Sequence, residues 1–423
     1  MRLKITGGML VNPAGEKRGR QDILIEDGII KAIGQNLGDA DKVIDAAGKT
    51  VFPGFIDLHC HLREPGQEHK EDIASGTRAA AKGGYTAVCC MPNTTPPVDN
   101  AAVCALVLEK ARRASVKVYP VGAATRGLEG RELTEMGEMA EVGCVAFSDD
   151  GKPIADGGMM RAAMRYAATF GRFIMAHEED TNISGSGVMN EGYHSTALGL
   201  PGISRVAEEA MIARDLLLAE TENLHVHIQH VSTAGGVRMI RDAKLSGVKV
   251  TCETAPHYFS LDDSACTSYD ARTKVNPPLR TPDDVEAIRQ GLLDGTIDCI
   301  ATDHAPHHKD EKHIEFSLAA SGISGFETAF SLAVNNLTDD ADTLARLFSV
   351  NPARIIGVKG GVIQEGAPAD VTIADMDAAY TLREEDIVSR GKNTPFIGRT
   401  LRGVVTHTIV DGRIVYDGGA ACR

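Results

Sequence analysis

The sequence predicts an α/β protein: a barrel of eight parallel strands joined to a small β domain built from both ends of the chain. Eight short apolar runs, each followed by a longer helical or loop segment, recur over about 300 residues, as expected for repeated βα units. Histidine or aspartate ends five of these runs, which suits the functional face of such a barrel. Strand-like segments with tight turns occupy both termini and predict the small domain.

Composition limits the class of protein. The chain has 423 residues, of which 43% are hydrophobic and 24% charged, which is enough to form a barrel with an accessory domain. Its net charge of −14 argues against nucleic acid or an anionic membrane as a partner. The nine cysteines form no CxxC pair. Together with a first segment that lacks a signal-peptide pattern, they predict a cytoplasmic protein with reduced thiols.

The small domain is predicted from two β-rich segments. Residues 1–52 contain short alternating strands and an Asp27-Gly28 turn, and a second Asp-Gly turn, Asp411-Gly412, lies near the other end. An Asp-Gly pair between alternating apolar positions is a strong hairpin signal. We therefore expect one β-sandwich domain from residues 1–52 and 358–423, and a barrel from residues 53–357.

The barrel strands are predicted from the apolar runs themselves. They lie at 53–60, 86–91, 116–123, 144–148, 172–176, 225–230, 248–253 and 297–302. Amphipathic helices fit between them, for example over 101–111 and 206–219. Eight βα units of this kind predict a TIM-like (β/α)₈ barrel.

The chemistry is expected where the strands end. His59 and His61 finish the first run. Residues i and i+2 of a strand point to the same side, so both imidazoles can face one ion. The tips of four further runs supply Asp149-Asp150, His177, His230 and Asp303. Four histidines and two aspartates suit two divalent ions, with zinc favoured and one carboxylate between them. Strand alternation alone leaves Asp149 and Asp150 open as that carboxylate.

Other polar residues near these tips are predicted to be less important. His225 and His227 are expected to face the outer helices, and the Glu178-Glu179-Asp180 run is expected to form a solvated loop or helix start.

Two long motifs resemble the signatures of the dihydroorotase family, in its long bacterial-type form within the amidohydrolase superfamily. The first is Asp57-Leu58-His59-Cys60-His61-Leu62-Arg63-Glu64-Pro65, and the second is Ala301-Thr302-Asp303-His304-Ala305-Pro306-His307, with Lys312 five positions later. Supporting matches include Met91-Pro92-Asn93-Thr94, Phe147-Ser148-Asp149-Asp150-Gly151, Asn276-Pro277-Pro278-Leu279-Arg280, Gly325-Phe326-Glu327-Thr328 and Gly391-Lys392-Asn393-Thr394-Pro395-Phe396. These motifs occur in the family's order over nearly the whole chain.

The resemblance implies a role for each site residue. His59, His61 and Asp303 would hold the more buried metal, His177 and His230 the second, and Asp150 would bridge them. The substrate contacts implied are His61, Arg63, Asn93, Asn276, His307, Ser321 and Gly322. One or two Zn²⁺ ions per chain are expected.

The resemblance also implies a reaction. In pyrimidine biosynthesis, such an enzyme would hydrolyse dihydroorotate reversibly to N-carbamoyl-aspartate. A metal-held hydroxide would attack the ring carbonyl, and Asp303 would serve as base and then acid. A homo-oligomer is expected, and association with aspartate transcarbamoylase is a further hypothesis.

Two alternative functions are considered. Hydantoinases and allantoinases share this layout but carry a carbamylated lysine at the tip of the fourth run. Here Ser148 follows Phe147, and Lys152 lies beyond the Gly151 turn. The other alternative is a non-catalytic scaffold for aspartate transcarbamoylase, which is disfavoured because all the expected ligands are present.

Overall fold

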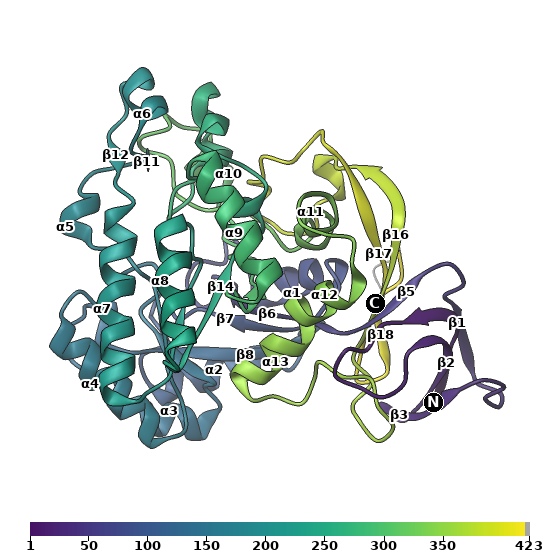
Figure 1. Ribbon diagram of the computed structural model, residues 1–423. Helices are drawn as coiled ribbons and strands as arrows, with labels where there is room; N and C mark the ends of the chain where they lie inside the picture. The colour runs from purple at the N-terminus through teal and green to yellow at the C-terminus, as the bar shows by residue number, and fades with distance from the viewer. Residues whose placement is uncertain (419–423) are drawn as a thin grey trace.

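The computed structural model describes residues 1–418 and contains the predicted barrel (Figure 1). Its eight strands form one sheet in the order β15-β14-β13-β10-β9-β8-β7-β6, and every neighbouring pair is parallel. The strands are β6 (Phe55–Cys60), β7 (Tyr85–Cys90), β8 (Lys117–Ala123), β9 (Ala146–Ser148), β10 (Ile174–Ala176), β13 (Val226–Ile228), β14 (Val250–Thr254) and β15 (Cys299–Ile300). Each one falls at a predicted apolar run, so the predicted fold class is confirmed.

The barrel closes where its last strand meets its first. Cys60 and His304 form a parallel bridge, and the amide of His61 donates to the carbonyl of His304 at 2.9 Å. Just below, the buried Asp57 carboxylate accepts from the amide of Thr302 at 2.7 Å and from its hydroxyl at 2.6 Å. These contacts hold the ends of β6 and β15 together.

Helices cover the outside of the barrel. The longer ones are α1 (Ile73–Lys82), α2 (Ala101–Ala111), α3 (Met136–Val142), α4 (Gly157–Thr169), α7 (Val206–Glu222), α8 (Ala234–Leu245), α9 (Pro282–Asp294) and α11 (Ala329–Asn336). Shorter ones are α5 (Thr181–Ser184), α6 (Tyr193–Leu198), α10 (Lys309–Lys312), α12 (Ala341–Ala345) and α13 (Asn351–Ile356). The predicted helix 101–111 coincides with α2. The bounds of helix α9 are set by its local sequence. Thr281 caps its amino terminus, Pro282 occupies its first turn, and Gly295 ends it with a φ of 82°.

The small sheet combines strands from both termini (Figure 1). Its order is β18-β17-β16-β5-β1-β2-β3, with β4 paired to β1. The strands are β1 (Arg2–Leu10), β2 (Gly19–Glu26), β3 (Ile29–Gly34), β4 (Lys42–Asp45), β5 (Thr50–Pro53), β16 (Val371–Thr381), β17 (Thr400–Val410) and β18 (Arg413–Tyr416), with β11 (Met189–Asn190) and β12 (Gly202–Ile203) forming a separate ribbon. Both Asp-Gly pairs turn hairpins, with positive φ at Asp27 and Asp411.

The two ends of the chain meet at one strand pair. Strand β5 runs antiparallel to β16, and Val51 lies opposite Ile373. The apolar core on this sheet includes Leu3, Ile23, Val371 and others from both termini. We propose that residues 1–52 and 358–423 form the small domain and residues 53–357 the barrel.

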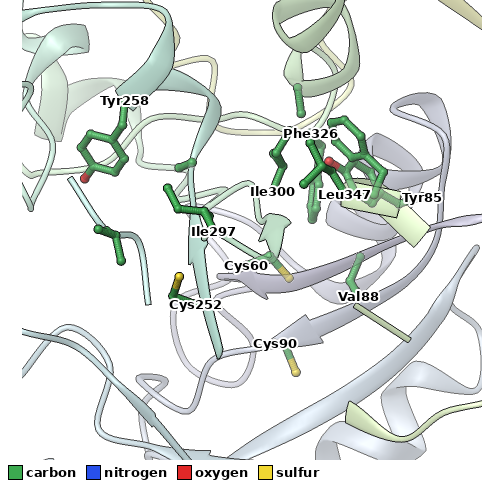
Figure 2. Packing of buried hydrophobic residues seen from close by; sticks show 14 of the residues in the cluster. Cys60, Tyr85, Val88, Cys90, Cys252, Tyr258, Ile297, Ile300, Phe326 and Leu347 are labelled. Carbon is green, nitrogen blue, oxygen red and sulfur yellow. The ribbon is translucent and has the colours of Figure 1, made fainter. Parts of the chain in front are cut away.

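Eight of the nine cysteines are buried free thiols, whereas Cys422 lies outside the described residues. Figure 2 shows Cys60, Cys90 and Cys252 among apolar side chains of the main core. Burial raises the pKa of Cys60 well above its ordinary value. Burial raises the pKa of Cys90 and Cys252 as well, so these three thiols contribute packing rather than reactivity.

Among residues 1–418, none of the helices has both the length and the apolar character that crossing a membrane requires.

An aromatic cluster joins the first barrel strand to the helices behind it. The Phe55 ring lies 5.1 Å from Phe348, 5.3 Å from Phe330 and 5.6 Å from Phe52, and Phe55 is fully buried. We predict that Phe55→Ala leaves a cavity and lowers the free energy of unfolding by about 3–5 kcal/mol. Urea unfolding checks this, with the exposed Leu245→Ala as control. An unchanged unfolding midpoint would contradict the role of the cluster.

Candidate metal centre

The six predicted metal ligands lie together at the carboxyl ends of five barrel strands. His59 lies in β6 with His61 just after it, and Asp150, His177, His230 and Asp303 follow β9, β10, β13 and β15. All six side chains are buried. The barrel thus brings residues separated by up to about 240 positions in the sequence to one rim, where this fold places its active sites.

The Asp150 carboxylate lies at the centre of the cluster. Its Oδ1 is 3.3 Å from Nε2 of His59, 3.5 Å from Nε2 of His230 and 3.7 Å from Nδ1 of His177. Its Oδ2 is 3.5 Å from Nε2 of His61. Two groups of possible metal ligands result, His59-His61-Asp150 and Asp150-His177-His230. Because Asp150 belongs to both groups, it occupies the position that a bridging carboxylate needs.

Asp303 adds a second carboxylate on one side of the cluster. Its Oδ1 lies 3.2 Å from Nε2 of His61 and 3.6 Å from Nε2 of His59. The structure therefore brings together His59, His61 and Asp303, the three residues expected to hold the more buried ion.

The neighbouring carboxylate, Asp149, does not join the cluster. Its Oδ1 accepts from the amides of Ala124 at 3.0 Å and Thr125 at 2.9 Å, and so holds the segment after β8. Of the two adjacent acids, Asp150 lies beside the imidazoles, whereas Asp149 binds the segment after β8.

His59 has the hydrogen-bonding pattern of a metal ligand. Its Nδ1 lies 2.8 Å from Oε1 of Glu253, so the ring proton on Nδ1 is held by that carboxylate. Its Nε2 is buried without a hydrogen-bond partner. An imidazole with a free lone pair on one nitrogen and a carboxylate on the other has the arrangement of a metal ligand. The residues fit a divalent ion.

The electrostatics of the cluster favour positive charge. Burial works against a protonated imidazole at His59, but the carboxylates of Asp150 and Asp303 raise its pKa well above the ordinary value. Burial likewise opposes the protonated form of His177, whose pKa is raised to about 9 by Asp150 and Glu179. A metal ion supplies the same positive charge and competes with these protons, so its affinity falls as the pH falls.

Two supporting carboxylates were not predicted from the sequence. Glu253 in β14 contacts His59 and lies 3.2 Å from Nε2 of His227. Glu179 lies 3.3 Å from Nε2 of His177 and accepts from the side-chain amide of Asn276 at 2.9 Å. Glu253 thereby orients the imidazole of His59, and Glu179 orients that of His177. The apolar run that contains Glu253 gave a signal for a strand but not for an inward-facing acid.

Two predictions about the surroundings are wrong. His227 is fully buried and faces Glu253 inside the barrel, although it was expected to face the outer helices. Glu178 is also buried, although it was expected in a solvated segment. Burial and the neighbouring Asp215 raise the pKa of Glu178 well above its ordinary value. The alternation of strand residues fixes which positions share a side but not which side is inward.

A cavity of about 220 Å³ opens onto the cluster. Its lining contains every predicted site residue except His59, which is fully buried. The lining residues are His61, Arg63, Asn93, Asp150, Gly151, His177, His230, Val275, Asn276, Asp303, Ala305, His307, Ser321 and Gly322. The cavity suits a small, polar molecule.

Arg63 supplies the cationic side of this cavity. Its Nε donates to the carbonyl of Pro306 at 3.2 Å, and its Nη2 lies 3.3 Å from Nε2 of His307. Burial lowers the pKa of Arg63 to about 10, so the guanidinium is charged at neutral pH. Burial and Arg63 lower the pKa of His307 to about 3, which keeps that imidazole neutral. Asn93 lies beside them, with its Oδ1 2.9 Å from Nδ1 of His61.

The backbone is unusual at three residues of the cavity. Arg63, His230 and Asp303 have φ values of 61°, 33° and 44°, in the left-handed region that non-glycine residues rarely adopt. Such conformations cost about 1–3 kcal/mol each and concentrate at functional sites. Here they turn the chain just after a strand ends and direct the side chains toward the cavity.

The fold and the donor set define a metal-dependent hydrolase of the amidohydrolase class. A model described as "Amidohydrolase family" matches residues 339–416, and one described as "Dihydro-orotase-like" matches residues 48–235. A dihydroorotase from Geotalea daltonii is 50% identical over 98% of this chain and 99% of its own length, and one from Pelotomaculum thermopropionicum is 52% identical over 98% of each. The chain belongs to the dihydroorotase family.

Solved structures confirm the fold. An L-hydantoinase (dihydropyrimidinase) from Arthrobacter aurescens matches with a TM-score of 0.88 at 25% identity, over 100% of this chain and 97% of that one. A dihydropyrimidinase from Brevibacillus agri matches with a TM-score of 0.87 at 23% identity, over 100% and 96%. The cyclic amidohydrolases therefore share this architecture at much lower sequence similarity than the dihydroorotases do.

The contact between His59 and Glu253 gives a test of the metal site. We predict that Glu253→Gln weakens metal binding by about 10–100-fold, because the imidazole loses the carboxylate that fixes its tautomer and orientation. Competition with a chromophoric chelator measures the affinity, and circular dichroism checks the fold. The exposed Glu365→Gln is the matched control. An affinity equal to that of the unaltered chain would remove Glu253 from this role.

Proposed function

We propose that this chain hydrolyses dihydroorotate reversibly to N-carbamoyl-aspartate, a step of pyrimidine biosynthesis. One observation carries the proposal: the metal-ligand cluster and the Arg63 guanidinium open onto the same cavity of about 220 Å³. The substrate is a small ring with an amide to be cleaved and a carboxylate to be recognised. The cavity offers a group for each, and the sequence relatives support the same reaction.

Recognition of the carboxylate is assigned to Arg63. A guanidinium presents two parallel N–H groups that match a carboxylate, which a lysine ammonium does not. Asn93 and Asn276 line the same cavity with polar side chains, and the carbonyl of Ser321 lies 2.9 Å from Nε2 of His307. His61, Asn93, Asn276, His307, Ser321 and Gly322 are proposed as further substrate contacts. They would fix the ring with its scissile amide toward Asp303.

The chemical step is assigned to the ligand cluster. His59, His61 and Asp303 would hold one ion, His177 and His230 a second, and Asp150 both. A bound divalent ion makes hydroxide available near neutral pH and polarises the carbonyl. Asp303 would take the proton from the attacking group and return it to the ring nitrogen as the amide bond breaks. Burial opposes the charged form of Asp303, but the surrounding imidazoles lower its pKa well below the ordinary value, so the carboxylate is ionised at neutral pH, as a base requires.

The alternative cyclic amides, those of hydantoinases and allantoinases, are less well supported. Asp150 occupies the central position where those enzymes would place a modified lysine, and Lys152 is exposed beyond the turn. A non-catalytic scaffold is also less well supported, because all six ligands converge. A panel of dihydroorotate, hydantoin and allantoin substrates separates these functions.

Several finer assignments belong to the same proposal. Zinc is proposed because imidazole and carboxylate ligands suit it, with one or two ions per chain. A homo-oligomer, association with aspartate transcarbamoylase and a cytoplasmic location are proposed as well. Metal analysis, sizing chromatography and co-purification test them in turn.

Asp303 provides the first test of the mechanism. We predict that Asp303→Ala lowers kcat by at least about 10²–10⁴-fold, the usual contribution of a positioned acid–base group. The metal should stay bound, since the remaining ligands still converge. Turnover of dihydroorotate and metal content are measured on the same preparation. Retained turnover would exclude Asp303 as the proton carrier.

Arg63 provides a test of substrate recognition. We predict that Arg63→Lys raises KM for dihydroorotate at least about tenfold, because the paired N–H contacts are lost while the charge is kept. The exposed Arg126→Lys is the control for the exchange itself. Unchanged KM and kcat would place the carboxylate elsewhere in the cavity.

A further inference from the structure

A second cavity, of about 500 Å³, adjoins the first and is not explained by the proposed reaction. Two motifs that the metal site does not use meet there: Lys312, which follows the second signature, and Lys392 with Asn393 of the Gly391-Lys392-Asn393 motif. None of the six metal ligands lines it. Within residues 1–418, His307 is the one residue that lines both cavities.

The cavity is strongly cationic, although the chain carries a net charge of −14. Five cationic side chains line it, against two carboxylates: Arg272, Lys309, Lys312, Arg390 and Lys392 face Asp270 and Glu384. Two of the five cations are paired: Arg272 donates to Asp270 at 2.6 Å and 2.9 Å, and Arg390 forms an ion pair with Asp72. The remaining cations are three lysines, Lys309, Lys312 and Lys392. A concave wall with this excess of cations attracts anions.

Lys312 is the buried member of this group. Only 4% of its surface is exposed. Its ammonium donates to the carbonyl of Ala320 at 2.7 Å and to that of Lys274 at 3.2 Å. An ammonium has three donors, so these two carbonyls leave one N–H for a ligand. Burial and the nearby Lys274 lower the pKa of Lys312 to about 7, and an anion in the cavity would stabilise its charged form.

The same lysine joins two segments of the substrate cavity. Lys274 precedes Asn276 by two positions, and its carbonyl also accepts from the amide of Gly322 at 2.9 Å. Ala320 precedes Ser321 directly. Asn393 completes this link, because its side-chain amide donates to the carbonyl of Gly322 at 2.9 Å. A ligand held by Lys312 and Lys392 would therefore contact the supports of both segments.

We propose that this cavity is a binding site for a small phosphorylated anion, separate from the substrate site. Phosphate oxygens accept several charge-assisted hydrogen bonds at once, which suits ammonium and guanidinium groups converging on one space. A volume of about 500 Å³ accommodates a phosphate with an organic group attached. Inorganic phosphate and a nucleotide share this chemistry, so both serve as probes.

Two exposed or half-buried lysines of the cavity allow a test that leaves the catalytic residues intact. The variant is Lys309→Gln with Lys392→Gln. The matched control is Lys31→Gln with Lys359→Gln, which removes the same charge at exposed positions. Lys31 lies in β3 and Lys359 just after α13, and both elements are away from α10 (Figure 1). Calorimetry on the metal-loaded protein measures the binding of inorganic phosphate and of a nucleoside 5′-monophosphate to the unaltered chain and to both variants.

The expected result is saturable binding of at least one probe, with Kd below about 1 mM. The Lys309/Lys392 pair should weaken it by at least roughly tenfold, as the loss of charged hydrogen bonds predicts, and the control pair should not. Tighter binding of the nucleotide would identify contacts beyond the phosphate, whereas equal affinity would assign recognition to the phosphate alone.

The proposal fails if neither probe shows saturable binding, or if the Lys309/Lys392 variant binds both probes as tightly as the control variant. The latter result would place the anion at the metal ions or Arg63 instead.

Discussion

The structure depends on one buried carboxylate that has four imidazoles around it. Taking the Asp150 charge out of water costs several kcal/mol unless positive charge surrounds it, and His59, His61, His177 and His230 lie within 3.3–3.7 Å of its oxygens. That arrangement requires four strands to end at the same height. The hydrogen bonds from Thr302 to Asp57 help to meet this requirement. They hold the first barrel strand, β6, against the segment after β15 that carries Asp303.

Much of this architecture could be predicted from the sequence, since its signals are local. Apolar runs bounded by polar tips identify the strands, and Asp27-Gly28 identifies a hairpin from two residues alone. The convergence of the six predicted ligands could be predicted for a related reason, because the carboxyl ends of all the strands of a parallel barrel lie at the same rim. A residue's place at the end of a predicted strand therefore indicates its place in the folded barrel.

The features that could not be predicted depend on which side of each strand faces the barrel interior and on how deeply each side chain is buried. Glu253 lies in β14, which is separated from the strand of His59 by β15 and is about 190 positions away in sequence. Only the registration of β14 within the barrel directs its side chain inward. His227 was placed on the wrong side for the same reason. The choice of Asp150 over Asp149 also required coordinates, because two adjacent acids at a strand tip differ only in the direction of their side chains.

The pairing of β5 with β16 has a consequence for how the chain is made. Strand β5 ends at Pro53, and its partner β16 begins at Val371, so β5 lacks this neighbour until the whole barrel between them has been translated. At about 5–20 residues per second, that interval lasts roughly 15–65 s. During synthesis β5 must therefore keep one edge unpaired, and the small sheet gains its β16 neighbour only after the barrel strands have been made.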